Sequence, residues 1–534
     1  MRMTLALALM VGGLMAGNPI TIDGLFNDWD SVMVAYTDGA QDTEEWDFGI
    51  LKVTNDDKFL FLYFTLRDAE QLIQDGNTLR LYIDADSDPA TGYGVHGLGA
   101  ELEWCFGCRS GVHHQSGTTN TLHQNDISLR TAPTITSQAF EVAISRSCDA
   151  LTAFGSREAV SIRLLLVGAE SGGDLLPDDD GGLQYTFDPQ PVEPPAPIPL
   201  ARTNPDDIRL VTYNVLWGGL TDSVRQPHFQ RILAALDPDI IAFQEQSGTV
   251  PEPSLIAGWL PGHQWYSSGQ YHGELLVFSR FPILAEAAFI PSERVAAILL
   301  DTQQQLGTAL LVLNAHFSCC SADDSRQQQA DEFIAGLRDL YNGSGPFQVE
   351  PSTPWILAGD LNLVGDRQQL TTLTTGDIND QAAHGLDFPP DLDSTAAEDL
   401  FSRQTHARMG YTWRNDNSVF SPGKLDYFIY SESALAVGNH YVLNTLAMPD
   451  STLAALQLEL EDYSASGTAG FLAKIDFFHD ALADRSDLEV REAYVDATID
   501  RFWARFWSSQ PDDVPSLEPL TRSTSARLSK HVAE

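Results

Sequence analysis

Alternating apolar and polar positions fill the first part of the chain, and turn residues separate them at short intervals. Alternation with a period of two is typical of half-buried strands, and short strands with frequent turns indicate an all-β sandwich. The segments that follow this pattern are ITIDG, FGILKVTND, FLFLYFTL, TLRLYIDAD, GAELEWCF, AFEVAISRS and AVSIRLLLVG. We therefore predict a β-sandwich domain over residues 18–188.

The segment 185–207, YTFDPQPVEPPAPIPLARTNPDD, has seven prolines and no periodic apolar pattern. Proline-rich segments adopt extended conformations and act as semi-rigid spacers. We predict a linker over 189–207.

After the linker, strand-like runs alternate with helical patterns at 224–236 and 325–341. Mixed strands and helices over such a length indicate an α+β sandwich with helices on its outer faces, which we predict for 208–478. Beyond 478 the pattern is polar and helical, so 479–534 is predicted to be a helical tail. The predicted strands are IRLVTYNVL, DIIAFQE, ELLVFSR, VAAILLD, ALLVLNAHF, PWILAGDLN and LDYFIYS.

The first residues, MRMTLALALMVGGLMAG, place a lone arginine before an apolar run that ends in small residues. This order predicts a secretory signal peptide over 1–17 and a secreted or periplasmic protein; an uncleaved anchor is the alternative. No later segment has 18 uninterrupted apolar residues, so no further membrane span is predicted.

The formal net charge is −43, from 31 basic and 74 acidic residues. Long nucleic acids are gripped by clustered lysine and arginine, so this charge disfavours tight, non-specific duplex binding unless a metal or a local basic patch offsets it. The same acidity suits a secreted protein in salty water.

Five cysteines are an odd number, so at least one thiol is free or pairs between chains. Cys105 and Cys108 have a zinc-type spacing, but no second pair of ligands accompanies them, and a local disulfide is the better interpretation.

Polar side chains follow the apolar strands of the second domain. Asp360 and Asn362 stand two apart after PWIL, so in an extended segment they would lie on one face, while Leu361 and Leu363 return to the core. Taken singly, each polar residue is also explained as a cap or turn residue. Together they suggest a site for a metal-bound water and a phosphate. The strand-end residues are Asn214, Glu245, His316, Asp360, Asn362 and Asp426.

The motifs TYNV, FQE, SRFPI, NAHF, GDLNLVGD and KLDY, in this order over 208–431, resemble the endonuclease/exonuclease/phosphatase family. The resemblance implies the four-layer α+β sandwich of the deoxyribonuclease I-like fold. It also implies hydrolysis of phosphodiesters or phosphomonoesters with Mg²⁺ or Mn²⁺. In that family pattern Glu245 is the main metal ligand, assisted by Asn214.

The same resemblance implies roles for the other residues. Asp360 would orient the attacking water, and Asn362 and His316 would stabilise the phosphoryl oxygens. Arg294 is a candidate phosphate contact, and a plain surface arginine is the alternative. Asp426 would orient a final histidine.

The sequence departs from the family where a terminal Ser-Asp-His is expected. The segment 462–478 reads DYSASGTAGFLAKIDFF, in which FLAKIDFF is predicted to be the last strand and glycines replace Asp-His. His479-Asp480 has the reversed order, and SDL at 486–488 has a leucine in the histidine place. We predict that Asp426 relies on water or Lys424, or that His479 folds back into the vacant place.

In the first domain Asp84, Asp86 and Asp88 alternate on a turn, and Glu101 follows on the next strand. Carboxylates this close repel one another unless a cation neutralises them, which predicts a Ca²⁺ site. A solvated acidic turn is the alternative.

With ITIDGLFNDW in front, residues 18–188 resemble the family-9-like carbohydrate-binding sandwiches. The resemblance implies a possible glycan partner, and Trp29, Trp46 and Trp104 are the available aromatics, although a core position explains each of them better.

These observations predict a secreted, metal-dependent phosphoesterase with a β-sandwich accessory domain and a phosphate ester of undetermined class as substrate. The competing hypothesis is a non-catalytic binding protein on the same scaffold. A sphingomyelinase-like lipid phosphodiesterase is a third, for which no membrane-binding loop is identified.

Overall fold

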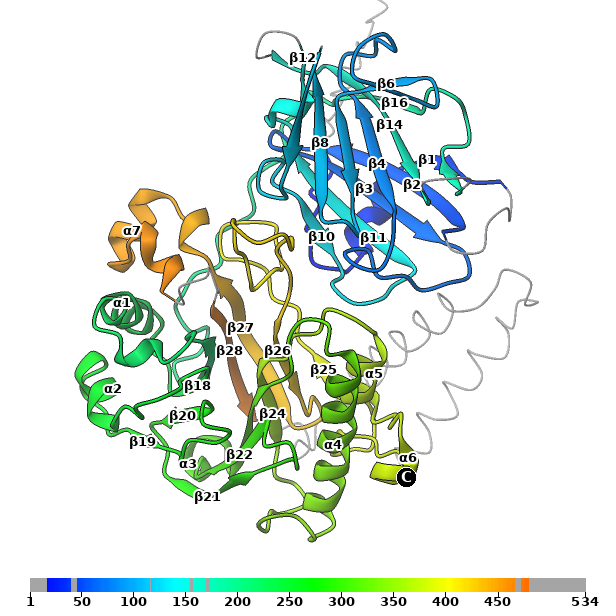
Figure 1. Cartoon of the computed structure of the whole chain (residues 1–534). Coiled ribbons are helices and arrows are strands. Elements are labelled where there is room, and N and C mark those ends of the chain that lie inside the picture. Colours follow the sequence, from blue (N-terminus) through cyan, green and yellow to red (C-terminus); the bar gives the residue numbers. More distant parts are fainter. Residues whose placement is uncertain are drawn as a thin grey trace, which may run out of the picture. The chain divides into compact units, whose positions relative to one another are not determined.

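The alternating segments of the first domain form two antiparallel sheets in the computed structural model (Figure 1). The structure describes residues 17–39, 46–115, 117–153, 157–169, 173–465 and 472–479. One sheet has the order β1 (Val34–Thr37), β2 (Phe48–Asn55), β3 (Phe59–Leu66), β11 (Ala139–Ser145), β10 (Arg130–Ala132). The other has the order β15 (Leu175–Leu176), β14 (Ser161–Val167), β4 (Arg80–Asp84), β7 (Leu102–Cys105), β8 (Ser110–Gln115), β9 (Thr118–Leu122), and β16 (Leu183–Thr186) also pairs with β14.

The inward residues of these two sheets form one apolar core, as alternation predicts. Two short pairs, β5 (Tyr93–Val95) with β6 (Leu98–Ala100) and β12 (Thr152–Ala153) with β13 (Arg157–Glu158), lie outside it. The prediction that ITIDG forms a strand of the sandwich is wrong. Ile22 instead makes an isolated bridge to Met409 of the second domain, because both are buried in a core that the two domains share.

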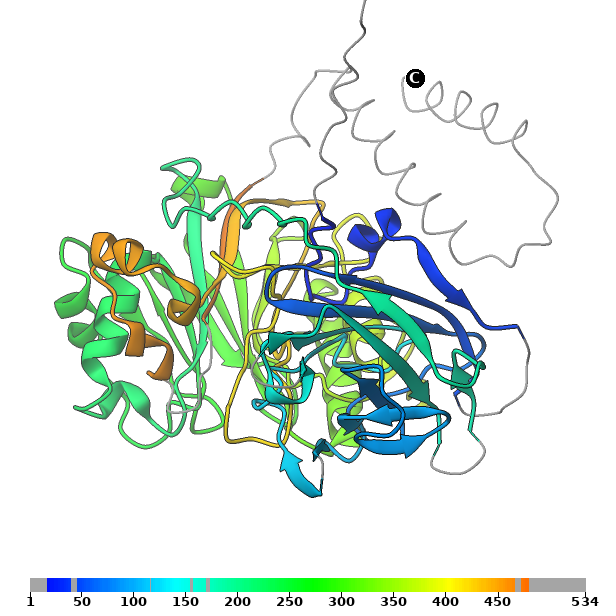
Figure 2. The same cartoon turned by 90° about the horizontal axis from the view of Figure 1, so that it is seen from above.

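The second domain contains two sheets of six strands each. In Figure 2 its green to orange strands can be followed separately from the blue and cyan strands of the first domain. The first sheet has the order β19 (Tyr266–Ser267), β20 (Leu276–Ser279), β18 (Ile240–Gln244), β17 (Ile208–Asn214), β28 (Leu472–His479), β27 (Leu435–Leu443). The second has the order β21 (Ile283–Ala288), β22 (Val295–Leu300), β23 (Leu310–His316), β24 (Trp355–Asp360), β26 (Asp426–Tyr430), β25 (Glu398–Asp399).

Successive residues of the central strands enter different cores. Leu210 of β17 packs between the two sheets, whereas Val211 packs under the helices. Figure 1 shows α1 (Gln226–Leu236) and α2 (Pro253–Trp259) on one side of the sheets and α4 (Asp323–Tyr341) on the other. The resulting layers are helix, sheet, sheet, helix, which confirms the predicted deoxyribonuclease I-like fold.

Smaller helices complete the domain: α3 (Gln303–Leu306), α5 (Gln368–Thr375), α6 (Gln381–His384) and α7 (Asp450–Leu456). The predicted helices at 224–236 and 325–341 correspond to α1 and α4, and the predicted last strand is β28. Within the described residues, no helix combines the length and the apolar character that crossing a bilayer requires. The predicted signal peptide, apart from residue 17, and the helical tail beyond His479 lie outside the described residues.

We predict that Phe333→Ala lowers the free energy of unfolding by about 3–5 kcal/mol. Phe333 of α4 is fully buried against the second sheet, so truncation removes apolar contacts and leaves a cavity. The matched control is Leu386→Ala, a side chain that is 75% exposed, for which we expect less than about 0.5 kcal/mol. Urea unfolding of both variants provides the comparison, and equal effects would contradict this account of the core.

Candidate active site

Strand direction brings the predicted polar residues to one edge of the two sheets. β17 runs parallel to β18, and β23 runs parallel to β24, so each pair has its carboxyl ends at the same edge. β26 runs antiparallel to β24, and its first residue therefore returns to that edge, with Asp426 opposite Asp360. All six strand-end residues line one cavity of about 780 Å³.

The side-chain amide of Asn214 joins the two sheets at this edge. Its Nδ2 donates to Oε1 of Glu245 at 2.8 Å and to Oδ2 of Asp360 at 3.0 Å. Its Oδ1 accepts from the backbone N–H of Leu216 at 3.0 Å. Asn214 therefore contacts two carboxylates through its nitrogen, and its role as an assisting metal ligand stays a prediction.

His316 is held by a glutamate that the sequence analysis missed. Nδ1 of His316 lies 3.0 Å from Oε1 of Glu274, and Arg294 donates to the same oxygen at 3.0 Å. Burial alone would lower the pKa of His316, but the Glu274 hydrogen bond and the charge of Asp360 outweigh it and raise the pKa. The proton on Nδ1 leaves Nε2 facing Glu245, at 3.9 Å.

Glu274 precedes the apolar run of β20 by two residues, a weaker signal than a strand-end position. Burial would raise the pKa of Glu274, but the hydrogen bond from His316 and the nearby cations lower it. Glu274 thus stays ionised and holds both His316 and Arg294 in place. Arg294 lines the cavity through this ion pair, so it is more than a surface arginine.

Asp360 and Asp426 lie together in the buried part of the site. Burial raises the pKa of Asp360 against the opposing effects of His316 and of the Asn214 hydrogen bond. Burial and then the charge of Asp360 raise the pKa of Asp426 well above its usual range, while Thr412 hydrogen-bonds to it. The negative charge of Asp360 therefore opposes ionisation of Asp426.

Left-handed backbone conformations occur at two of the catalytic candidates. Glu245 has φ of 57° and Asn362 has φ of 49°, which side chains other than glycine adopt only at some cost. The prediction that Asp360 and Asn362 share a face of one extended strand is therefore wrong, because β24 ends at Asp360. The turn instead directs the N–H of Asn362 to Oδ1 of Asp360 at 3.1 Å, and both residues still line the cavity.

The donor set at this edge fits a hard divalent cation. Mg²⁺ is bound by one or two carboxylates and keeps several waters or substrate oxygens. Glu245 lines the cavity and its carboxylate is fixed by Asn214, so it can serve as such a ligand. The described carboxylates that cluster in threes lie elsewhere, in the first domain.

Two predicted substitutes for the missing histidine are wrong. Lys424 pairs with Asp399 at 2.8 Å, its ammonium lies over the rings of Phe401 and Tyr427, and it is not among the residues that line the cavity. β28 runs antiparallel to β17, with Ala473 opposite Thr212 and Phe477 opposite Ile208. The backbone of His479 therefore lies at the end of the sheet opposite to Asn214.

The acidic turn of the first domain brings three of its four predicted ligands together. Carboxylate oxygens of Asp84, Asp86 and Glu101 lie within 4.8 Å of one another. Burial raises the pKa of Asp84, and burial followed by the two aspartates raises the pKa of Glu101 to about 7. Asp88 is not part of this group; its carboxylate accepts the N–H of Ala90 in the turn.

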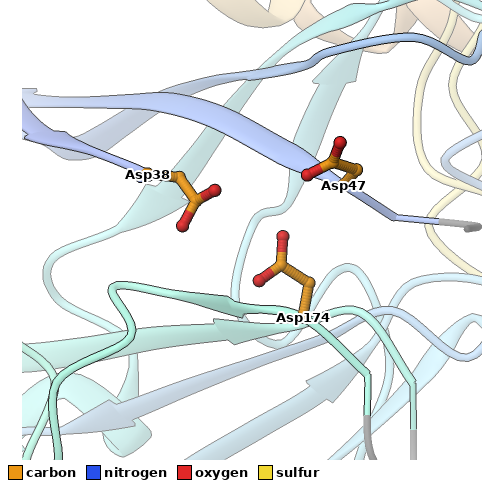
Figure 3. Close-up of side chains that lie close together, drawn as sticks. All are labelled: Asp38, Asp47 and Asp174. Atoms are coloured by element: carbon orange, nitrogen blue, oxygen red, sulfur yellow. The ribbon is translucent and has the colours of Figure 1, made fainter. Parts of the chain in front are cut away.

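Figure 3 shows a second carboxylate cluster, formed by Asp38, Asp47 and Asp174. All three are buried, and Arg67 pairs with Asp38 at 3.3 Å and with Asp47 at 3.5 Å. The cluster joins segments distant in the sequence, so no local pattern indicated it.

The remaining predictions for the first domain concern its aromatic residues and cysteines. Trp29, Trp46 and Trp104 are each 1% exposed, which confirms that they belong to the core and offer no face to a sugar ring. Cys105 and Cys108 form the predicted disulfide. The free cysteines are Cys148, Cys319 and Cys320.

Comparison with known proteins locates the family resemblance in the second domain. Residues 211–448 match the Endonuclease/Exonuclease/phosphatase family. A search of curated proteins finds no match.

Several solved structures resemble about half of the chain. The 3'-5' exonuclease from Neisseria meningitidis is 16% identical, with 51% of this chain and 100% of that chain covered and a TM-score of 0.32. The human Nocturnin catalytic domain is 14% identical, with 52% and 96% covered and a TM-score of 0.32. Sphingomyelinase C from Streptomyces griseocarneus is 14% identical, with 51% and 99% covered and a TM-score of 0.30.

We predict that Ca²⁺ raises the melting temperature of the protein and that Asp86→Ala reduces this shift. A cation that binds only the folded state stabilises it by about 2.7 kcal/mol at a hundredfold excess over its dissociation constant. Differential scanning fluorimetry with Ca²⁺ and with a chelator provides the measurement. Asp57→Ala, at an exposed aspartate of the same domain, is the matched control.

An undiminished shift in Asp86→Ala would contradict binding at the acidic turn. Asp174→Asn, assayed in parallel, would then show whether the cluster of Figure 3 holds the ion.

Proposed function

We propose that this chain is a secreted, metal-dependent phosphoesterase, because residues 211–448 match the Endonuclease/Exonuclease/phosphatase family. The observation that carries the proposal is the Asn214 amide, which holds Glu245 of one sheet and Asp360 of the other at one cavity. Phosphoryl transfer requires neutralised phosphoryl oxygens and an oriented water, and these groups can supply both.

Glu245 would hold Mg²⁺ or Mn²⁺, with the Asn214 amide fixing its carboxylate. When bound, the metal supplies positive charge to the phosphoryl oxygens. Asp360, acceptor-only when ionised, orients the attacking water. His316, whose pKa is raised by the hydrogen bond to Glu274 and by the charge of Asp360 despite its burial, donates from Nε2 to a phosphoryl oxygen when it is protonated there, and the amide of Asn362 offers a further donor.

A second candidate is a non-catalytic phosphate-ester-binding protein on the same scaffold. The sequence immediately before β28, SASGTAGF at 464–471, contains neither aspartate nor histidine. A histidine acting as general acid or base contributes about 10²–10⁴ in rate. Asp426 is accompanied by Thr412 and Asp360 instead, which favours weak or absent turnover with metal binding preserved.

Export from the cytoplasm is part of the proposal. The disulfide between Cys105 and Cys108 supports it, because disulfides persist in oxidising compartments. The strongly acidic composition is compatible with an extracellular environment, and it disfavours long duplex nucleic acid as the substrate.

We predict that the wild type binds Mn²⁺ and hydrolyses bis-p-nitrophenyl phosphate slowly, and that EDTA abolishes this turnover. Glu245→Gln should lose one equivalent of bound Mn²⁺ together with activity. Asp360→Asn should keep that equivalent and lose at least about 10²-fold in kcat, since it removes the group that orients water. Isothermal titration and release of p-nitrophenolate measure the two quantities.

The control is Glu252→Gln, at an exposed glutamate, which should match the wild type in both assays. Turnover that survives EDTA and Glu245→Gln would refute the assignment of the site. Bound Mn²⁺ without turnover of this ester, plasmid DNA or sphingomyelin would favour the non-catalytic candidate.

A further inference from the structure

The two loops that adjoin Asp360 and Asp426 both contact the first domain. One is the segment 361–367, which follows Asp360, and the other is the segment 411–425, which precedes Asp426. Each loop makes hydrogen bonds to residues near β10 of the sandwich. These bonds connect the sandwich to the residues on either side of the catalytic centre.

The segment 361–367 is held by the turn between β10 and β11. Thr134 donates from Oγ1 to the carbonyl of Leu363 at 2.8 Å in a buried contact. The N–H of Thr136 donates to the carbonyl of Gly365 at 2.9 Å, and its Oγ1 accepts from the N–H of Arg367 at 2.9 Å. Three hydrogen bonds within five residues fix the backbone just beyond Asn362.

The segment 411–425 is held by β10 and the loop before it. Thr131 and Ser421 share a buried hydroxyl–hydroxyl hydrogen bond of 3.1 Å. Gln124 donates from Nε2 to the carbonyl of Asn415 at 3.2 Å. Met409 and Tyr411 enter the apolar core that contains Ile22 and Trp29. Polar and apolar contacts both fasten this loop to the sandwich.

Arg109 of the sandwich reaches the same cavity as the catalytic residues. Its Nη2 pairs with Asp75 at 2.6 Å, and its Nε donates to the carbonyl of Gln74 at 2.8 Å. Its guanidinium lies over the ring of Phe420, 4.1 Å from the centroid. These three contacts fix the plane of the guanidinium, and none of them uses Nη1.

Aromatic side chains border the cavity from the second domain. Trp217 is 79% exposed, and its left-handed backbone, with φ of 48°, is fixed where the N–H of Gly218 donates to the carbonyl of Glu245 at 2.7 Å. Trp413 and Phe420 also line the cavity. Exposed aromatic faces stack on flat rings such as nucleobases.

We propose that the sandwich is a wall of the catalytic pocket and that Arg109 contacts the ring-bearing substituent of a phosphoester of single-nucleotide size. The inference rests on the proposed phosphoesterase function and narrows its substrate class. A cavity of about 780 Å³ suits one compact ligand. The net charge of −43 also disfavours a continuous duplex as the substrate.

The test compares KM and kcat for thymidine 5'-(p-nitrophenyl phosphate) with those for p-nitrophenylphosphorylcholine, both with Mn²⁺. Arg109→Gln should raise KM for the nucleotide ester about tenfold and leave kcat within about twofold, since it removes a charged hydrogen-bond donor that contacts the substrate away from the reacting phosphate. KM for the choline ester, which lacks a flat substituent, should not change.

The matched control is Arg146→Gln in the same domain. Arg146 also contacts a backbone carbonyl, a carboxylate and an aromatic ring, through Asp56, Glu158 and Phe187, but it is not part of the cavity wall. Its KM should equal that of the wild type. Phe420→Leu, which removes the ring beneath the guanidinium, should raise KM for the nucleotide ester as Arg109→Gln does, and melting curves of each variant separate this effect from misfolding.

Two results would overturn this inference and leave the proposed phosphoesterase function standing. One is turnover of the nucleotide ester with a KM that Arg109→Gln does not change. The other is cleavage of supercoiled plasmid as fast as cleavage of the nucleotide ester. A choline ester that is the better substrate and is equally sensitive to Arg109→Gln would also overturn it. If the wild type turns over neither ester, equilibrium dialysis measures binding of the nucleotide ester to the wild type and to Arg109→Gln. Arg109-dependent binding would then support the pocket wall while refuting the proposed catalysis, and Arg109-independent or absent binding would refute both.

Discussion

The hydrogen bonds that cross between the two sheets at one edge are the constraint on which the site depends. Asn214 connects Glu245 and Asp360 across the edge, and deeper in the core Gln244 donates to Asn314 of the other sheet at 2.8 Å. Asn314 in turn donates to the carbonyl of Phe243 at 2.9 Å. Buried polar groups without partners are costly, so these amides fix how the sheets meet. Apolar packing alone would permit small shifts that separate the carboxylates.

The sandwich extends this constraint to the loops beyond the strands. Loops that carry catalytic residues are usually the most mobile part of a domain. Here Thr134 and Thr131 hold the segments next to Asn362 and Asp426, and a shared apolar core accompanies the hydrogen bonds. The β-sandwich therefore contributes to the geometry of the centre as well as to its wall, which a separately tethered module could not do.

The ionisable groups on the two sides of the site differ in how their charges are balanced. The hydrogen bond to Glu274 fixes the tautomer of His316 and, together with the charge of Asp360, raises the pKa of this imidazole despite its burial, while Arg294 pairs with Glu274. Burial raises the pKa of Asp360 although the charge of His316 opposes this shift, and burial together with the charge of Asp360 raises the pKa of Asp426. The sequence between Ser464 and Phe471 contributes no imidazole to this side. The slow turnover that we propose rests on this departure of the sequence from the family pattern.

The sequence by itself determined the two kinds of domain, the principal helices and most central strands, because hydrophobic periodicity depends only on local order. It also determined the six strand-end residues, since each lies at or next to one end of an apolar run. Tertiary structure alone decided what those residues contact. The amide of Asn214 donates to two carboxylates, and Glu274 hydrogen-bonds to His316. Lys424 pairs with Asp399, and the backbone of His479 lies at the other end of its sheet. It also placed Arg109 at the cavity and joined Asp38, Asp47 and Asp174. These outcomes depend on strand register and on packing between segments distant in the chain, and no local pattern of residues encodes either.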